Sequence, residues 1–408
     1  MKPDFRTAFL FLVLLAGVSL NSCFGPARLA YRNIATFYHP DFEMKDLSFE
    51  VFNLNDTLSN LYIKFPFPGL TYTTGKGTPT ANYRLHYEVF EGYESSRIVD
   101  SATFSGVDSL GRAGYFFDSV LLVLPERKNY TVHVVLQDVI SGKNHGKILE
   151  INKQAQHSAA GFLLCNEDGV PLMRNYLYKG EKVRLRHAVA SQVWLYHHPG
   201  EQVAAAPPFA FTATPDFQAG DSLLKLVFSN SFSNTFSLSE YGIYFIPDGS
   251  KPFVIHRFYD GFPEISNPGV MRESLRYISA EAEYQAMFDK PARAAVDEFW
   301  VKVTGHPERA LSQIRRYYKR VEEANRFFSV AAEGWKSDRG MIYLVYGPPA
   351  VVYRTQNSEE WTYGEAGNPM SVRFLFNLNV NRPVPDFEML RSENYRNTWN
   401  MAVSNWRR

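Results

Sequence analysis

Short stretches of alternating apolar and polar residues follow one another along the first third of the chain. Segments such as "LSFEVFNL", "YRLHYEVF" and "YTVHVVLQDV" place apolar side chains at every second position, as a strand with one buried face requires. The breaks between them, such as "NDTLSN" and "SGVDSLGRAG", are rich in Gly, Asn, Asp and Ser, which favour turns. The pattern predicts an immunoglobulin-like β-sandwich over residues 46–152.

The alternation resumes in a second region, residues 156–265, with "EKVRLRHAVA", "QVWLYHH", "SLLKLVFS" and "YGIYFIP". The segment "GFLLCNEDGVPL" fits a hairpin whose turn is Asn166-Glu167-Asp168-Gly169. We expect a second, smaller immunoglobulin-like β-sandwich here, with the Ala- and Pro-rich "AAAPPFA" as a linker inside it.

Beyond residue 270 the apolar period changes to that of a helix, over residues 277–303 and again over residues 306–334. The second of these segments carries a single apolar stripe, formed by Ala310, Ile314, Tyr317, Val321, Ala324 and Phe328. Four short strands are then predicted, at residues 341–346, 350–355, 360–363 and 371–378. Residues 270–408 are therefore expected to form an α+β domain, with helices packed on one face of an antiparallel sheet.

The C-terminal tail "SENYRNTWNMAVSNWRR" has an apolar side at helical spacing, made of Tyr395, Trp399, Ala402, Val403 and Trp406. Two interpretations stay open at this stage. The stripe packs onto the protein's own sheet, or it docks a partner or the membrane interface, where Trp is favoured.

The N-terminus "MKPDFRTAFLFLVLLAGVSLNSC" has a basic start and an apolar run too short to span a membrane, which predicts an export signal over residues 1–22. Leu20-Asn21-Ser22-Cys23 resembles the lipobox of bacterial lipoproteins. The resemblance implies cleavage before Cys23 and lipidation of that residue, with residues 23–45 as lipidated N-terminus and tether. An ordinary secretory peptide with a chance cysteine is the alternative.

The tether "FGPARLAYRNIATFYHP" holds no cluster of Asp or Glu. An acidic patch directly after the cysteine would resemble the signal that directs Bacteroidota lipoproteins to the cell surface. Its absence favours an outer-membrane protein that faces the periplasm.

Several classes of chemistry lack a sequence signal. The formal net charge is +1 and Lys and Arg are scattered, so we expect no nucleic-acid partner. The one adjacent histidine pair, His197-His198, would point to opposite faces of a strand, so we expect no metal and no cofactor. Of two cysteines, Cys165 lies in an apolar string and has no partner if Cys23 is acylated.

A tripeptide of Asp, a hydroxyl residue and an apolar residue recurs along the two β-rich regions. It resembles the O-glycosylation motif of exported Bacteroidota proteins, which would make candidate sites of Thr57, Ser101, Ser109, Ser119 and Ser222. The alternative is turn chemistry, because Asp-Ser also opens turns well.

The last third carries an ordered set of motifs, "DEFW" at residues 297–300, "GWKSDRG" at 334–340, "YGPP" at 346–349 and "EWTY" at 360–363. Together these motifs resemble the GWxTD-domain lipoproteins of Bacteroidota. Ser337 replaces the usual threonine and keeps the hydroxyl. The family has no established enzymatic activity, so the resemblance implies a location and a fold rather than a reaction. The motif residues are Gly334, Trp335, Ser337, Asp338, Arg339, Gly340, Gly347, Pro348 and Trp361.

One interpretation gives the motif residues purely structural roles. Trp335 would cover a helix–sheet junction, and Ser337 or Asp338 would cap backbone N–H groups. Gly340 would allow a positive φ. Arg339 would pair with an acid, for which the candidates are Asp338, Asp297 and Glu298.

The other interpretation is catalytic: Asp338 would act as a general acid or base, and Arg339 would hold an anion. The sequence offers no second carboxylate or histidine at a dependable spacing. We therefore expect a non-enzymatic outer-membrane lipoprotein that acts as a scaffold or accessory subunit of an envelope complex for outer-membrane assembly or transport. The alternative is an envelope hydrolase or transferase with its site at the turn of Asp338 and Arg339.

Overall fold

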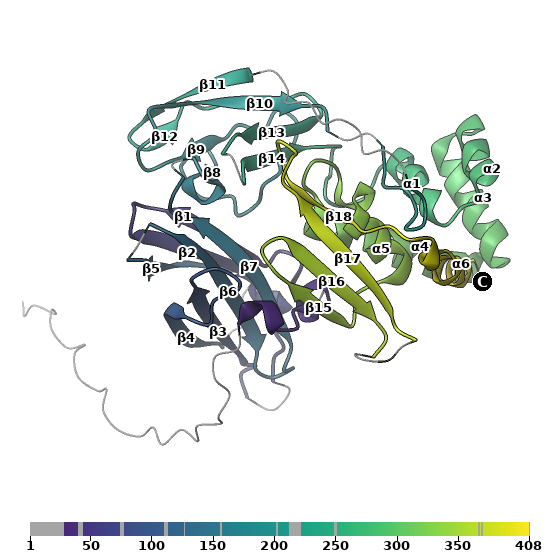
Figure 1. Ribbon diagram of the computed structural model, residues 1–408, viewed down its shortest axis with the longest axis horizontal. Helices are drawn as coiled ribbons and strands as arrows, with labels where there is room; N and C mark the ends of the chain where they lie inside the picture. Colours follow the sequence, from purple (N-terminus) through teal and green to yellow (C-terminus); the bar gives the residue numbers. More distant parts are fainter. Residues whose placement is uncertain are drawn as a thin grey trace, which may run out of the picture.

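The computed structural model describes residues 28–407, apart from residues 40–43, 74–76, 110–112, 126, 156, 201–202, 212–221, 249–250, 366–367 and 369. The expected signal segment and Cys23 lie outside this range. Figure 1 shows two β-rich parts, with the C-terminal sheet beside both and most of the helices on the far side of that sheet. Within the described residues, no helix has the length and apolar character that a membrane crossing requires.

The first β-rich part consists of two antiparallel sheets that share one apolar core. Their orders are β1-β2-β5 and β4-β3-β6-β7. Alternate side chains such as Leu61 and Ile63 from one sheet and Val132 and Val134 from the other fill the core, because a strand points every second side chain to the same face. The strands are β1 (Ser48–Asn53), β2 (Leu58–Pro66), β3 (Ala81–Phe90), β4 (Ile98–Asp108), β5 (Tyr115–Val123), β6 (Asn129–Asp138) and β7 (Asn144–Asn152).

The strands of the second part join in one seven-stranded order, β14-β13-β10-β11-β12-β9-β8. Alternation fixes which face a side chain takes but leaves the strand partners open, so the sequence pattern could not give this order. The predicted hairpin turn is present, with Gly169 N–H donating to Asn166 O at 3.0 Å. The strands are β8 (Leu163–Cys165), β9 (Arg184–Arg186), β10 (Gln192–His198), β11 (Ser222–Ser229), β12 (Phe232–Ser233), β13 (Gly242–Ile246) and β14 (Phe253–Arg257).

The C-terminal part combines helices with a four-stranded antiparallel sheet of order β15-β16-β17-β18. The helices are α1 (Pro268–Ser274), α2 (Glu281–Ala286), α3 (Ala292–Thr304), α4 (Pro307–Phe328), α5 (Asp338–Tyr346) and α6 (Arg396–Trp406). The strands are β15 (Val351–Arg354), β16 (Ser358–Tyr363), β17 (Val372–Asn379) and β18 (Asp386–Met389). One core cluster holds both the helical stripe of α4 and the inner face of the sheet.

The prediction of a strand at residues 341–346 is wrong, because this segment forms the second half of helix α5. Met341, Ile342, Tyr343, Leu344 and Val345 are all buried, so the helix shows no polar face from which its period could be read. A short apolar run of this kind cannot be assigned to helix or strand by pattern alone. The strand β18 follows a Pro-containing segment and was not predicted.

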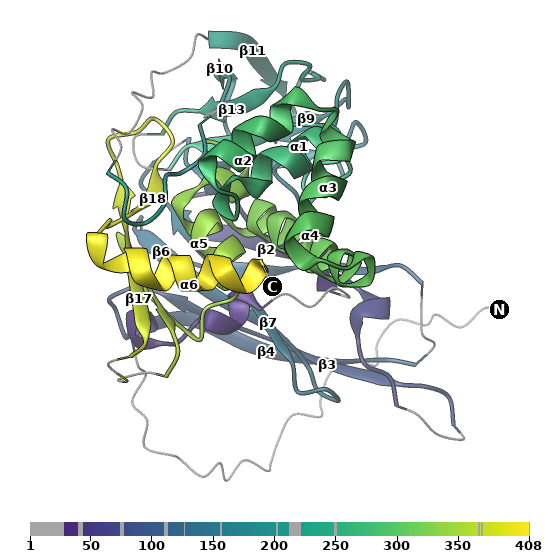
Figure 2. The same ribbon diagram turned by 90° about the vertical axis from the view of Figure 1, so that its right-hand side faces the viewer.

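Figure 2 shows α6 in front of the sheet and next to α5. Trp399 and Trp406 are buried in the core, and Trp406 Nε1 donates to Val345 O at 3.0 Å. Of the two interpretations of the tail, the structure therefore supports packing onto the protein's own domain.

The segment expected to be a tether is built into the fold from residue 28 to residue 39. Ile34 N–H donates to Val352 O at 3.0 Å, next to the edge strand β15, and Ala30 N–H reaches Tyr93 O in the first part at 3.3 Å. The 3-10 turn η2 (Ala35–Tyr38) buries Ala35 and Tyr38 in the C-terminal core. This part of the chain joins the first and last parts to each other.

Candidate functional site

Ser337 decides where α5 begins. Its Oγ accepts from Gly340 N–H at 3.0 Å and donates to Gly334 O at 2.8 Å. The sequence predicted that Ser337 or Asp338 would cap backbone N–H groups at a turn before a strand. Ser337 does so as the N-cap of a helix, which places both Asp338 and Arg339 in the first turn of α5.

The two motif glycines permit close contacts between backbone segments. A Cβ at Gly334 would lie 1.9 Å from Ala324 O, and a Cβ at Gly340 would lie 1.8 Å from Gly334 O. Gly340 is helical, so the positive φ expected there is wrong. The glycines are needed because helix α4, the turn and helix α5 stack without room for a side chain.

Asp338 is held by the far end of the domain. Its Oδ2 accepts from Met389 N–H at 2.8 Å and from Arg391 at 3.2 Å, and Oδ1 also binds Arg391. Because both oxygens are engaged and the residue is buried, its carboxylate serves to fix the chain after β18 against the start of α5.

Arg339 pairs with acids other than those expected from the sequence. Its guanidinium reaches Glu359 at 3.4 Å and Asp386 at 3.1 Å. Asp297 and Glu298 instead lie on the exposed side of α3, where they pair with Arg293 and Lys290. Pairs at positions this far apart in the chain have no spacing by which a sequence could reveal them.

Glu359 is the centre of this charge network and is 0% exposed. Its carboxylate accepts from Tyr38 at 2.8 Å, Trp361 Nε1 at 3.3 Å and Arg339 at 3.4 Å, and it pairs with Arg354 at 3.2 Å. Burial alone would raise the pKa of Glu359, but Arg339 and Arg354 outweigh that cost and hold the pKa below its ordinary range.

The network continues into the other parts of the molecule through Arg354 and Glu150. Arg354 lies 3.9 Å from Glu150 of β7, whose carboxylate also accepts from Tyr93 at 3.2 Å. Lys251, which precedes β14, forms an ion pair with the same carboxylate. Charged and polar side chains, buried at Glu359 and half-buried at Glu150 and Lys251, thus connect the first part, the second part, the N-terminal segment and the C-terminal domain.

Of the remaining motif residues, Trp335 and Trp361 lie in the core of the C-terminal domain. Trp335 is buried edge-on against Tyr277, and Trp361 packs against Tyr38, Phe328 and Phe376. Gly347, with a φ of +91°, ends α5, and its carbonyl accepts from Tyr363 at 2.7 Å. Pro348 follows in the connection to β15.

Residues 242–408 match the model of the GWxTD domain. The chain therefore contains a GWxTD domain, and the matched region begins at β13, inside the seven-stranded sheet. No match was found among the curated proteins.

Solved structures resemble the chain only weakly. They include a Bacteroides fragilis protein described as a beta-galactosidase (12% identity, 33% of this chain, 20% of that chain, TM-score 0.19). A red sea bream transglutaminase is similar at 9% identity over 52% of this chain and 31% of that chain, with a TM-score of 0.19. The BSP domain of a biofilm-associated protein is similar at 11% identity over 55% of this chain and 62% of that chain, with a TM-score of 0.17. The matches span under two thirds of those chains and carry no argument about fold or function.

The other predicted sites are scattered over the surface and the core. Thr57, Ser101, Ser109 and Ser119 are exposed, while Ser222 begins β11 and its side chain is outside the described set. His197 Nε2 contacts Tyr241 O at 3.0 Å, and His198 accepts from Gly200 N–H. Cys165 is buried, and burial raises the pKa of its thiol to about 12. Cys23 lies outside the described residues.

Sequence reasoning missed most partners of the GWxTD motif, among them Tyr38, Arg354, Glu359, Asp386 and Arg391. One signal was available for Glu359. It lies two positions before Trp361, so the two side chains share the inner face of β16, where an apolar residue is the usual choice. A carboxylate at such a position indicates a buried partner of opposite charge.

Proposed function

We propose that the protein is a non-enzymatic outer-membrane lipoprotein, lipid-anchored at Cys23 and facing the periplasm, which acts as a scaffold or accessory subunit of an envelope complex. The observation that carries this proposal is the environment of the Asp338 and Arg339 side chains. Both side chains are buried and engaged in ion pairs, so the motif serves as a structural joint. Two immunoglobulin-like modules in series would then present extended binding surfaces.

The surface of the first part supports a binding role. One face of the edge strand β5 exposes Tyr115, Phe117, Leu121 and Val123. Its neighbour Tyr62 stacks on Phe117 at 6.1 Å and lies in the cluster that packs against the second part. Exposed apolar groups that adjoin a packed face are typical of interaction surfaces.

The alternative is an envelope hydrolase or transferase that uses Asp338 and Arg339. Purification from gently solubilised membranes separates the two functions. A partner present in stoichiometric amount supports the scaffold. A protein that purifies alone, turns over an envelope substrate and loses that activity in Asp338→Asn with an unchanged melting temperature would overturn it.

A further inference from the structure

Leu29 is the first buried residue in the described part of the chain, and it lies only six positions after Cys23. It is 1% exposed and packs with Phe90 and Tyr93, the second of which belongs to the turn between β3 and β4. Next to it, Ala30 N–H donates to Tyr93 O at 3.3 Å. The chain is therefore fixed to the first part of the molecule from Leu29 onward.

The same segment is also fixed to the C-terminal domain. Ile34 N–H donates to Val352 O at 3.0 Å, and Val352 N–H donates to Asn33 Oδ1 at 2.9 Å. Between these contacts, Arg32 forms an ion pair with Glu88 of β3. Residues 29–34 thus keep one position on the molecule, because they could leave it only by breaking bonds to two of its parts.

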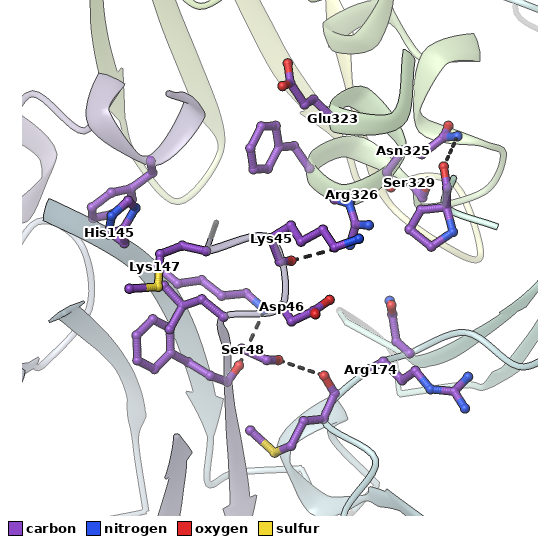
Figure 3. A pocket seen from close by; sticks show the side chains of 18 of the residues that line it. Lys45, Asp46, Ser48, His145, Lys147, Arg174, Glu323, Asn325, Arg326 and Ser329 are labelled. Atoms are coloured by element: carbon purple, nitrogen blue, oxygen red, sulfur yellow. Dashed lines mark hydrogen bonds between the residues drawn. The ribbon is translucent and has the colours of Figure 1, made fainter. Parts of the chain in front are cut away.

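A second stretch of N-terminal residues joins all three parts. Figure 3 shows Lys45 and Ser48 beside the cleft where the parts meet. Lys45 O accepts from Arg326 of α4 at 3.4 Å, and Ser48 Oγ donates to Met173 O of the second part at 2.8 Å. Because each part is joined to the N-terminal residues, the orientation of these residues at a membrane would set the orientation of the whole molecule.

The distance from Cys23 to Leu29 has an upper limit that depends only on the number of residues between them. A fully extended chain spans about 3.3–3.6 Å per residue, so the six steps span at most roughly 22 Å. A compact chain of about 380 residues has a radius of gyration of roughly 21 Å and hence a diameter of roughly 50 Å. A lipid on Cys23 would therefore hold the side of the molecule around Leu29 towards the membrane, since the far side lies beyond this reach.

The surface next to Leu29 carries groups suited to lipid headgroups. Tyr31 is 67% exposed, and Arg28 is exposed as well. In the turn after β3, the side chain of Arg97 is 63% exposed. Tyrosine is enriched at the membrane–water interface, and arginine is attracted to anionic headgroups. Glu91, which pairs with Arg97, keeps the charge of this surface low, so the lipid would supply most of the binding energy.

We infer that the surface formed by Arg28, Tyr31 and the turn of residues 91–97 lies against the phospholipid bilayer that holds the Cys23 lipid, with the second β-rich part directed away from it. In Figures 1 and 2, β10 and β11 lie at the top of the molecule, and the purple N-terminal segment lies in its lower half. The inference rests on the lipid anchor of the proposed function and adds a defined orientation to it.

The test compares two fluorescent labels on the full, lipidated chain in vesicles of phosphatidylethanolamine and phosphatidylglycerol, some of whose headgroups carry a quencher. Glu94→Cys places a label in the turn next to Tyr93, and Ser191→Cys places one just before β10; both residues are exposed. Only the introduced thiol reacts, because Cys165 is 0% exposed and Cys23 is acylated. The label at residue 94 should be quenched several-fold more strongly than the label at residue 191.

A matched variant removes the limit on distance and leaves the folded residues unchanged. Twenty Gly and Ser residues inserted between residues 27 and 28 add roughly 70 Å of reach at full extension, so the two labels should then be quenched to a similar degree. A difference that survives the insertion would also support the orientation, and would attribute it to the lipid affinity of the surface itself. Equal quenching without the insertion, or stronger quenching at residue 191, would overturn the inference.

The intact mass of the same purified chain separates failure of this inference from failure of the anchor. Acyl groups on Cys23 together with equal quenching at the two positions would overturn the orientation and leave the lipoprotein standing. A mass without acyl groups would overturn the anchor, and the orientation with it.

Discussion

Tyr38 and Glu359 lie 321 positions apart, and the tyrosine hydroxyl donates to the carboxylate at 2.8 Å inside the core. Because Tyr38 belongs to the N-terminal segment and Glu359 to the GWxTD sheet, this hydrogen bond holds the two ends of the chain together. The expected tether is therefore an integral part of the C-terminal domain as far as residue 39.

Replacing Tyr38 with Phe should lower the free energy of unfolding by about 1–3 kcal/mol, since the buried carboxylate loses a donor. Urea titration followed by circular dichroism measures this. Tyr31→Phe is the matched control, since Tyr31 is 67% exposed, and should change the stability little. Equal effects of the two variants would mean that the hydrogen bond has no role in stability.

A pH-dependent contact holds the same segment to the first part. Glu88 pairs with Arg32 and lies 3.4 Å from His133. Burial opposes ionisation of Glu88, but the hydrogen bonds from His133 and Arg32 outweigh it and lower the pKa to about 2. A carboxyl with a depressed pKa stabilises the fold above its unfolded pKa and loses that effect as the pH falls towards its folded pKa.

The difference in unfolding free energy between wild type and Glu88→Gln should therefore shrink as the pH falls from roughly 5 towards 2. Denaturant titrations at several pH values measure it, with the exposed Glu94→Gln as control. A difference that stays constant over this range would show that Glu88 has the same pKa in both states.

Gly340→Ala should destabilise the protein, although Ala is normally the better helix residue by about 1 kcal/mol. The new Cβ would lie 1.8 Å from Gly334 O, so α5 has to move, at a cost of about 1–3 kcal/mol or more. Thermal melting checks this against Gly77→Ala, where nothing lies within 4 Å of the added atom. A stabilised Gly340→Ala would contradict the close packing of the motif.

Deleting residues 394–408 should expose the core of the GWxTD domain and make it sensitive to protease. Trp406 packs edge-on against Tyr317 at 5.1 Å, with Arg316 and Arg320 over its ring. Trp406→Ala alone should cost about 3–5 kcal/mol. Limited proteolysis and melting measure both, and Met401→Ala, on the exposed face of α6, is the control. Unchanged melting of the truncated chain would favour a docking role for the tail.

Cys23→Ser should abolish acylation and release the protein from membranes, because a terminal lipid supplies the main anchoring energy. Fractionation after a salt wash, together with the intact mass of the mature chain, tests the expectation. A Ser variant that remains fully bound would show that the folded parts or a partner hold the protein at the membrane.

Local sequence determined the elements whose pattern needs no distant partner. Alternation predicted strands of the first part such as β1, β3 and β6, the apolar stripe predicted α4, and the stripe ending at Trp406 predicted α6. Residues 105–108, which the sequence analysis assigned to a break, belong to β4. The sequence also predicted a cap at Ser337 or Asp338, because an N-cap acts within three residues of itself, and Ser337 is the residue that caps.

Tertiary structure decided everything that depends on which segments meet. The run from Met341 to Val345 could not be recognised as a helix from the sequence, because a helix buried on all sides shows no polar face. The strand order of the second part could not be predicted either, because alternation does not specify which strands pair. Arg339 found Glu359 and Asp386 because buried charges pair in space, with Tyr38 brought to the same carboxylate from the other end of the chain.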